Sequence, residues 1–412
     1  PAMAGFNDAG LTAGSAYSYR VRAADAAGNL SGYSTAAGAA TPVDNIAVTL
    51  TPVRGSLTIS QTLTRTANVA GDLGAAGVTW SATSGTFSAR TATSATYVAP
   101  LTAGVVTITA TSAADPARSA SATLGVTDLA LVGTYHNDNA RDGANTREFA
   151  LTTANVNTAT FGKLFSCPVD GAIYAQPLWV SNLMINGAKH NVVIVATQHD
   201  SVYAFDADTG PCTTLWHASL LDAAHGATPG ETSVPSGTGN GLVGSGYGDV
   251  KPEVGITGTP VIDPVTNTLY VVSKSAVANA LPIHQRLHGL SLLDGSERAA
   301  SPTAIDSSIA VAGTGDGSTN SLLRFDPQNE FQRPGLALVN GIVYAAWASH
   351  EDHDPYHGWV IGFNASTMAL APNAVFNSTP NHVGSVTYSR GGIWMGGGAP
   401  AVDSSGNLYL ST

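Results

Sequence analysis

The stretch NVVIVATQHDSVYAFDADTG at residues 191–210 decides the fold, because its pattern returns three times further along the chain. The later copies are GTPVIDPVTNTLYVVSKS at 258–275, RPGLALVNGIVYAAWASHED at 333–352 and GAPAVDSSGNLYLST at 398–412. A proline marks the start of each repeat: Pro177 lies upstream of the first stretch, and Pro260, Pro334 and Pro400 lie within the later ones. Short apolar strands separated by Gly, Asn and Asp turns follow, so the pattern predicts a series of small antiparallel sheets.

Four antiparallel strands per repeat make the blade of a β-propeller. The prolines lie roughly 65–85 residues apart, more than a bare blade needs, so we expect insertions between the blades. Residues 129–412 therefore predict an incomplete propeller of about three blades and the start of another. The remaining blades are expected to be missing from this chain, and Phe161–Pro168 is predicted to be an outer strand that closes the ring.

The first 128 residues predict two β-sandwich domains, which makes the whole chain all-β. The run AYSYRVRA at 16–23 alternates polar and apolar residues, as a half-buried strand does. Further strands are separated by turns at the spacing of a sandwich. These strands are predicted at Ile46–Leu50, Val78–Ser81, Ala95–Val98, Val105–Ala110 and Ser119–Val126.

Three resemblances add detail to this organisation. GLTAGSAYSYRVRAADAAGNLSGYS at 10–34 resembles the last strands of a fibronectin type III domain, which implies that 1–41 is the C-terminal part of one and that the Tyr17 hydroxyl bonds to the backbone. VTWSATSGTFS at 78–88 is similar to a bacterial Ig-like domain, which implies that 42–128 packs around Trp80. DSVYAFDADTG at 200–210 resembles a blade turn of bacterial propellers with repeats like those that bind pyrroloquinoline quinone (PQQ), which implies a PQQ-like propeller over 129–412.

Composition excludes some partners and favours others. The net charge is −11, so we expect no nucleic-acid partner, and no apolar run reaches the ~18–20 residues of a membrane span. Charged residues make up 11%, well below the roughly 25% of average globular proteins. Low charge and Ig-type modules favour an exported protein, extracellular or on the cell surface. Protein or carbohydrate partners at the cell surface suit that location.

The only two cysteines leave two alternatives open. Cys167 and Cys212 either form a disulfide or are two separate small buried residues. They lack the CxxC spacing of a zinc or redox site. A disulfide would fit an oxidising compartment.

The loop that joins the second and third strands of each blade, and the connections between blades, emerge on one face. These segments carry most of the unusual polar residues, including Lys274 and Glu330, so we expect a ligand-binding face there. Its predicted members are His199, Asp200, Glu253, Arg333, Arg390 and Trp394. Trp394 lies between Gly-Gly and Met-Gly-Gly-Gly, where its ring can serve as a stacking platform.

The densest polar run is SHEDHDPYHGW at 349–359. Its imidazole and carboxylate groups could supply nitrogen and oxygen ligands to Zn²⁺, Cu²⁺ or Ni²⁺. The candidate ligands are His350, Glu351, Asp352, His353 and His357. The alternative is a polar loop whose carboxylates cap backbone amides and whose histidines form local hydrogen bonds.

No motif commits the chain to a reaction, so two functions stay open. One is a secreted or cell-surface binding or scaffold protein whose propeller face is the contact surface. The other is an oxidoreductase that uses PQQ or a divalent metal on that same face. The PQQ dehydrogenases that the repeats resemble have adjacent cysteines over the quinone, and this sequence has no adjacent cysteines.

Overall fold

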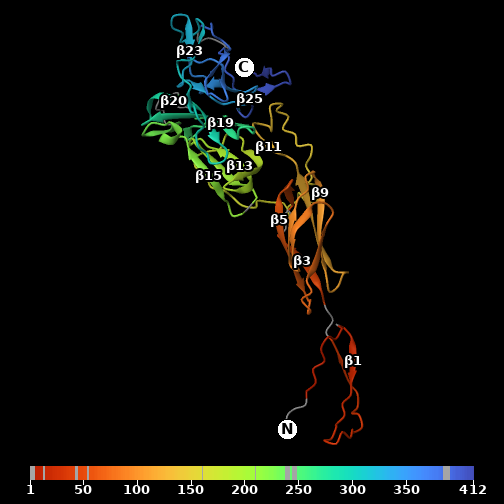
Figure 1. Cartoon of the computed structure of the whole chain (residues 1–412). Helices are drawn as coiled ribbons and strands as arrows, with labels where there is room; N and C mark the ends of the chain where they lie inside the picture. The colour runs from red at the N-terminus through yellow and green to blue at the C-terminus, as the bar shows by residue number, and fades with distance from the viewer. Residues whose placement is uncertain are drawn as a thin grey trace. The chain divides into compact units, whose positions relative to one another are not determined.

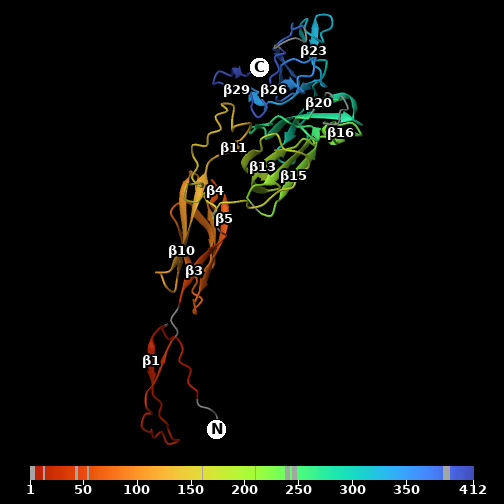
Figure 2. The ribbon, with the colours of Figure 1, turned by 180° about the vertical axis from the view of Figure 1, so that it is seen from behind.

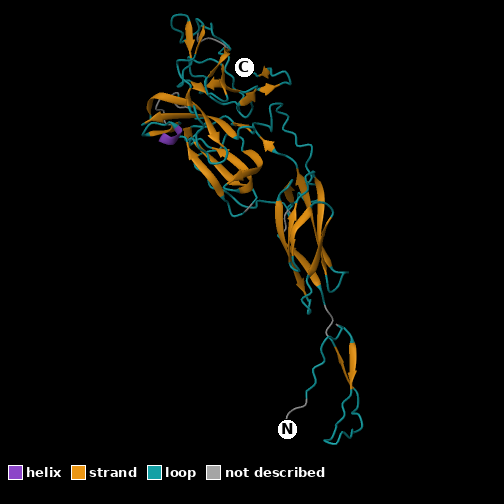
Figure 3. Cartoon of the chain, in the orientation of Figure 1, coloured by secondary structure: helices purple, strands orange, loops and turns teal. Residues whose placement is uncertain are grey.

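The computed structural model describes residues 5–12, 14–41, 45–52, 55–159, 161–208, 210–236, 242–243, 248–383 and 390–412. Regular structure in these ranges is almost entirely β-strand (Figure 3). The exception is one turn of 3-10 helix at Ala223–His225. The prediction of an all-β chain is confirmed. Within the described ranges, no helix has the length and apolar character that crossing a membrane requires.

The chain forms two compact units. The first comprises Pro1–Asp128 with Arg147–Asn157, and the second comprises Leu129–Thr146 with Thr158–Thr412. The segment 147–157 belongs to the first unit because it packs on it directly. The Arg147 guanidinium lies 2.9 Å from the Asp128 carboxylate, and a Cβ added at Gly125 would collide with the backbone of Ala150. Glycine is therefore required at that close approach.

The first unit begins with a hairpin and continues as a two-sheet sandwich. Strands β1 (Ala16–Tyr19) and β2 (Ala37–Ala40) are antiparallel, and the Tyr17 hydroxyl accepts a hydrogen bond from the Thr12 amide at 2.8 Å. One sheet has the order β3 (Ala47–Thr51), β5 (Thr62–Ala70), β8 (Ser94–Val98), β7 (Thr86–Arg90). The other has the order β4 (Ser56–Thr58), β10 (Ser119–Thr127), β9 (Gly104–Ser112), β6 (Val78–Ala82). Trp80, Tyr97 and Ile108 lie buried between the two sheets, as alternation along each strand requires.

The second unit contains three main antiparallel sheets in succession along the chain (Figure 1). The first sheet is β11 (Leu131–Val132), β12 (Leu178–Ile185), β13 (Ala188–Ala196), β14 (Ser201–Asp206) and β15 (Thr214–Ser219). The second is β16 (Glu231–Pro235), β17 (Glu253–Val254), β18 (Val261–Asp263), β19 (Thr268–Val277), β20 (Ala280–Ser291) and β21 (Thr303–Ala304). The third is β24 (Glu330–Phe331), β25 (Ala337–Val339), β26 (Ile342–Ser349), β27 (Trp359–Asn364) and β28 (Leu370–Asn377).

Two short strand pairs complete the second unit. They are β22 (Ala310–Ala312) with β23 (Leu322–Arg324), and β29 (Ala401–Val402) with β30 (Leu408–Tyr409). The second pair corresponds to the predicted start of another repeat. Figure 2 shows the sheets following one another from β13 and β15 to β20 and then β26.

Strand β19 is buried on both faces because its sheet lies between the other two. Leu269 and Val271 belong to the core shared with the first sheet, whereas Tyr270 and Val272 belong to the core shared with the third sheet. The alternation continues into polar residues at the end of the strand. Ser273 and Ser275 follow the parity of Leu269, and Lys274 follows the parity of Tyr270. One strand therefore delivers polar groups to two different interfaces.

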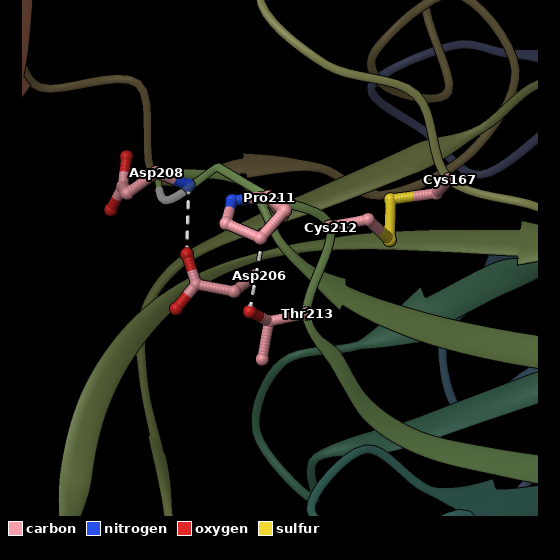
Figure 4. The surroundings of a disulfide bond; sticks show 6 residues. All are labelled: Cys167, Asp206, Asp208, Pro211, Cys212 and Thr213. Carbon is pink, nitrogen blue, oxygen red and sulfur yellow. Dashed lines mark hydrogen bonds between the residues drawn. A yellow bond between two sulfur atoms is a disulfide. The ribbon is translucent and has the colours of Figure 1, made fainter.

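The predicted outer strand at Phe161–Pro168 is wrong, because the structure assigns no strand to its described residues, 161–168. Strands β11 and β15 form the two edges of the first sheet. The segment is held covalently instead: Cys167 and Cys212 form a disulfide with their Cα atoms 5.2 Å apart (Figure 4). Cys212 lies in the connection between β14 and β15, so the bond ties the incoming chain to the outer edge of the first sheet.

Candidate functional site

A buried charge cluster lies where β19, β24 and β26 end, and we define it as Asp200, Lys274, Glu330 and His350. The Lys274 ammonium donates to the carbonyls of Gln328 and Glu330 at 3.1 Å each and to His350 Nε2 at 2.8 Å. These three acceptors match the three N–H groups of an ammonium. The amide of Lys274 also donates to the Asp200 carboxyl at 3.3 Å. Side chains from three sheets therefore meet at one lysine.

Burial controls the protonation of this cluster. It lowers the pKa of Lys274 to about 7 and raises the pKa values of Asp200 and Glu330 well above their usual range. Burial also lowers the pKa of His350 well below its usual range, and the positive charges of Lys274 and Arg333 lower it further. Burial therefore favours the neutral imidazole of His350, whose Nε2 lies against the Lys274 amino group.

A row of rings and one guanidinium leads from this cluster to the surface. His350 stacks on Phe331 with ring centroids 4.3 Å apart. The Arg333 guanidinium lies over the rings of Phe331 at 5.5 Å and Trp394 at 5.8 Å. Trp394 meets Tyr356 edge to face at 6.0 Å. Because Trp394 and Arg333 are only partly buried, the outer end of the row is accessible to a ligand.

The same end of the unit carries exposed charge pairs. His199 Nδ1 lies 3.0 Å from the Glu253 carboxylate, and Arg390 pairs with Asp354 and lies over the Tyr356 ring. Glu253 also acts electrostatically on Asp200, which connects this pair to the buried cluster. His199 and Glu253 thus form one pair, Asp200 lies in the buried cluster, and Arg333, Trp394 and Arg390 follow the row of rings through Tyr356. These residues come from segments far apart in the sequence.

The five predicted metal ligands are directed to different partners. His357 contacts the Thr379 hydroxyl and the Asp316 carbonyl at 3.0 Å each, and Glu351 accepts from the Gly248 amide at 3.2 Å. Asp352 accepts from the Tyr356 hydroxyl, and the His353 amide donates to the His350 carbonyl.

Among the described residues, no group of three or more His, Cys, Asp or Glu side chains could hold a metal ion. The backbone explains the separation, because Glu351 and Asp352 both have positive φ and turn the loop away from His350. His350 also contacts an ammonium, which would repel a cation. The loop matches the alternative of local hydrogen bonds, and the metal set of His350, Glu351, Asp352, His353 and His357 is not assembled.

A second polar group, which the sequence did not reveal, lies between the first and second sheets. Ser273 Oγ is 2.8 Å from His288 Nε2, and His288 Nδ1 is 2.5 Å from the Glu297 carboxylate. This order of serine, histidine and carboxylate is that of a hydrolase triad. Ser273 is 1% exposed and His288 is 0% exposed, so no substrate carbonyl can reach the hydroxyl. The group is a buried hydrogen-bonded chain that joins neighbouring strands.

Three hollows on the second unit lie away from the predicted face. They have volumes of about 330, 370 and 420 Å³. The first lies beside Tyr270 and Arg298, the second beside Tyr344 and Phe376, and the third beside His284 and Asp306. The third is also lined by Gln328, whose carbonyl accepts from Lys274, so this hollow reaches the buried cluster from its other side. None of the three is lined by a residue predicted for the binding face.

Comparisons with known proteins identify no family. No family model matches the chain. An alpha-amylase from Niallia circulans is 60% identical over 40 residues, which is 10% of this chain and 3% of that protein. The chain therefore spans only a small part of that curated relative. The fibronectin type III and Ig-like assignments stay predictions.

Two solved structures are similar at low scores. A quinohemoprotein alcohol dehydrogenase from Pseudomonas putida is 14% identical, with a TM-score of 0.29, and the match covers 66% of this chain and 41% of that one. A DUF4784 family protein from Bacteroides caccae is 9% identical, with a TM-score of 0.15 and coverages of 79% and 94%. At these scores neither likeness carries an argument about the site.

Proposed function

We propose that the chain belongs to an exported bacterial binding protein whose contact surface is formed by His199, Glu253, Arg333, Arg390 and Trp394, with Asp200 buried beneath them. The observation that supports this proposal is convergence, because segments from three successive sheets contribute these side chains. Loops on a rigid β framework are where binding residues concentrate. The partly buried arginines and tryptophan also match the residue types that dominate binding energy at protein surfaces.

Unsatisfied polar atoms at this end support binding over a purely structural role. Within the described residues, Asp200 Oδ2, Glu330 Oε2 and His353 Nε2 are buried without a hydrogen-bond partner. Each such atom costs roughly 1–3 kcal/mol of stability.

The first unit supports the role of a spacer. Its exposed sheet faces carry hydroxyl contacts, such as Thr64 with Thr96 at 3.1 Å and Thr109 with Ser121 at 2.8 Å. The disulfide between Cys167 and Cys212 supports an oxidising setting outside the cytosol. We therefore propose that protein or carbohydrate at the cell surface is the partner.

The oxidoreductase alternative has less support from the residues. The described part of the site offers no group of three or more ligands for a divalent cation, and its two cysteines form a bond across 45 residues rather than an adjacent pair. The residues present therefore do not fit the quinone and metal chemistry of PQQ dehydrogenases.

The test is a binding screen of the whole chain against soluble glycans and peptides, with thermal shift as the first readout and calorimetry as the second. Trp394→Ala and Arg390→Ala should abolish binding of any ligand that the screen identifies. Arg118→Ala, an exposed residue of the first unit, is the matched control and should bind like wild type. Dye-linked alcohol or sugar oxidation after addition of PQQ and Ca²⁺, lost in the face variants, would overturn the proposal in favour of an enzyme.

A further inference from the structure

The Arg333 guanidinium makes fewer hydrogen bonds than those of Arg286 and Arg141, two other arginines of the second unit. Arg286 donates three hydrogen bonds at 2.7–3.2 Å, and Arg141 donates five to acceptors that include the carbonyls of Leu336 and Pro400. Arg333 makes none with the residues that the structure describes, and its Nε is buried. Its nearest carboxylate, that of Asp249, lies 3.9 Å away and is half exposed.

The position of Arg333 is nevertheless fixed. The carbon of its guanidinium lies 5.5 Å from the centre of the Phe331 ring and 5.8 Å from that of the Trp394 ring. These ring contacts supply no acceptor oxygen, so the Nη donors stay available. A planar fork of donors in a fixed position is the geometry that recognises a carboxylate or phosphate with two parallel hydrogen bonds.

The charges around Arg333 also favour an anion. Lys274, Arg333 and His353 all lower the pKa of the His350 imidazole electrostatically, so all three lie near that ring. The Glu330 carboxyl beside Lys274 is buried, and burial raises its pKa well above the usual range, which favours its uncharged form. His353 Nε2 is buried, and within the described ranges it has no hydrogen-bond partner. These nitrogen groups gather near Arg333 although the chain as a whole carries a charge of −11.

The backbone leaves room beside the guanidinium. A Cβ added at Gly396 would lie 3.0 Å from both Nε and Nη2 of Arg333, which is closer than side chains normally approach. Glycine at this position keeps a side chain away from Nη2, whereas Nε itself is buried. Gly396 is exposed and the Arg333 side chain is 25% exposed, so solvent reaches part of the guanidinium.

We propose that Arg333 is the anchor of an oxyanion subsite within the binding face, which takes a carboxylate or phosphate group of the ligand. The inference rests on the proposed function, because it names the chemical group that the face recognises. Trp394 forms one wall of the subsite, and Gly396 forms the approach to it.

The experiment titrates the whole chain with sodium acetate, inorganic phosphate or neutral acetamide at constant ionic strength, and follows binding by calorimetry and tryptophan fluorescence. Wild type should bind acetate or phosphate saturably and acetamide not at all. The two anion arms distinguish the carboxylate from the phosphate. Arg333→Gln should weaken binding by about tenfold or more, the loss expected for a charge-assisted pair.

Two further variants keep the test decisive if Arg333→Gln unfolds. Gly396→Ala retains the arginine and should weaken anion binding by crowding its edge, whereas Arg118→Gln removes an exposed arginine elsewhere and should bind like wild type. Equal binding by wild type and Gly396→Ala, or no saturable anion binding by wild type, would overturn the subsite. A neutral ligand that needs Trp394 but not Arg333 would also end this inference while leaving the proposed function in place.

Discussion

The two polar interfaces of the second unit differ in how completely their groups are paired. Between the first and second sheets, the Arg286 guanidinium makes two hydrogen bonds of 2.7 Å to Glu231, and Ser275 donates to the same carboxylate. At the end of the second and third sheets, Lys274 is satisfied, but Glu330 Oε2 and Arg333 Nε have no hydrogen-bond partner among the described residues.

The comparison teaches that burial alone does not mark a functional site here. Glu231 and Glu330 are both buried, yet the hydrogen bonds of Arg286, Ser275 and Thr228 hold the pKa of Glu231 far below its usual range despite its burial, while burial raises that of Glu330 well above it. A paired carboxylate belongs to the framework. In Glu330, Oε1 accepts from the His357 amide and the Trp359 indole, and only Oε2 is left without a partner among the described residues.

The largest expected effect is a loss of stability at the fully paired interface, between the first and second sheets. Arg286→Met leaves the Glu231 carboxylate buried without its counter-charge, and we expect a loss of about 3–5 kcal/mol in the stability of the second unit. Scanning calorimetry of the whole chain measures this as a lower transition for that unit. The double variant Glu231→Met/Arg286→Met should recover most of the loss, and a double variant as unstable as the single one would contradict the explanation.

The next effect is a pH dependence from Lys274, whose pKa falls from about 10.4 in the unfolded chain to about 7 in the folded one. Between these values the unfolded chain binds one more proton than the folded chain does. The contribution of Lys274 to stability should therefore rise with pH from about 7 toward 10, with a slope of up to about 1.4 kcal/mol per pH unit, and stay flat below 7. Calorimetric transitions of Lys274→Met should lack this slope, so an unchanged slope in the variant would contradict the assignment.

A smaller effect tests the buried serine chain. Ser273→Ala leaves His288 Nε2 without its partner, and the expected cost is about 1–3 kcal/mol. A fluorophosphonate probe should label neither wild type nor the variant, because Ser273 is closed to solvent. Labelling at Ser273 would show that the interface opens and that the chain is a candidate hydrolase. Ser296→Ala, at an exposed turn, is the control.

The smallest effect concerns the exposed pair of Arg390 and Asp354. Asp354→Asn should change stability by less than about 1 kcal/mol, because solvent screens the pair. It should strengthen binding of acetate or phosphate if Arg390 contributes to the oxyanion subsite. Calorimetric titration of the two proteins side by side measures this, and weaker anion binding by Asp354→Asn would exclude Arg390 from that role.

Local patterns predicted the strands well. The five strands predicted between Ile46 and Val126 correspond to β3, β6, β8, β9 and β10, because alternation of one buried face is visible in a single segment. Trp80 is in the sandwich core for the same reason. The strand predicted at Phe161–Pro168 was wrong, because its composition suits a strand but its position in the fold is set by a disulfide.

Side-chain partners were harder to predict, because they come from distant segments. Lys274 and His350 are 76 residues apart, and nothing local to the run 349–359 shows that His350 turns inward while Glu351 turns outward. Ser273 and His288 are only 15 residues apart. Two polar residues that face one another across an apolar hairpin were the signal that could have revealed this hydrogen-bonded pair.

The disulfide has a mechanical consequence for the second unit. Tension applied to the two ends of the chain passes from Cys167 to Cys212 through the sulfur bridge, so β12, β13 and β14 between them carry no load. The 45-residue loop would otherwise yield about 150 Å of slack when pulled out. In force spectroscopy, oxidised chains should extend less than reduced ones by that length, so the bridge would keep the first sheet folded under shear.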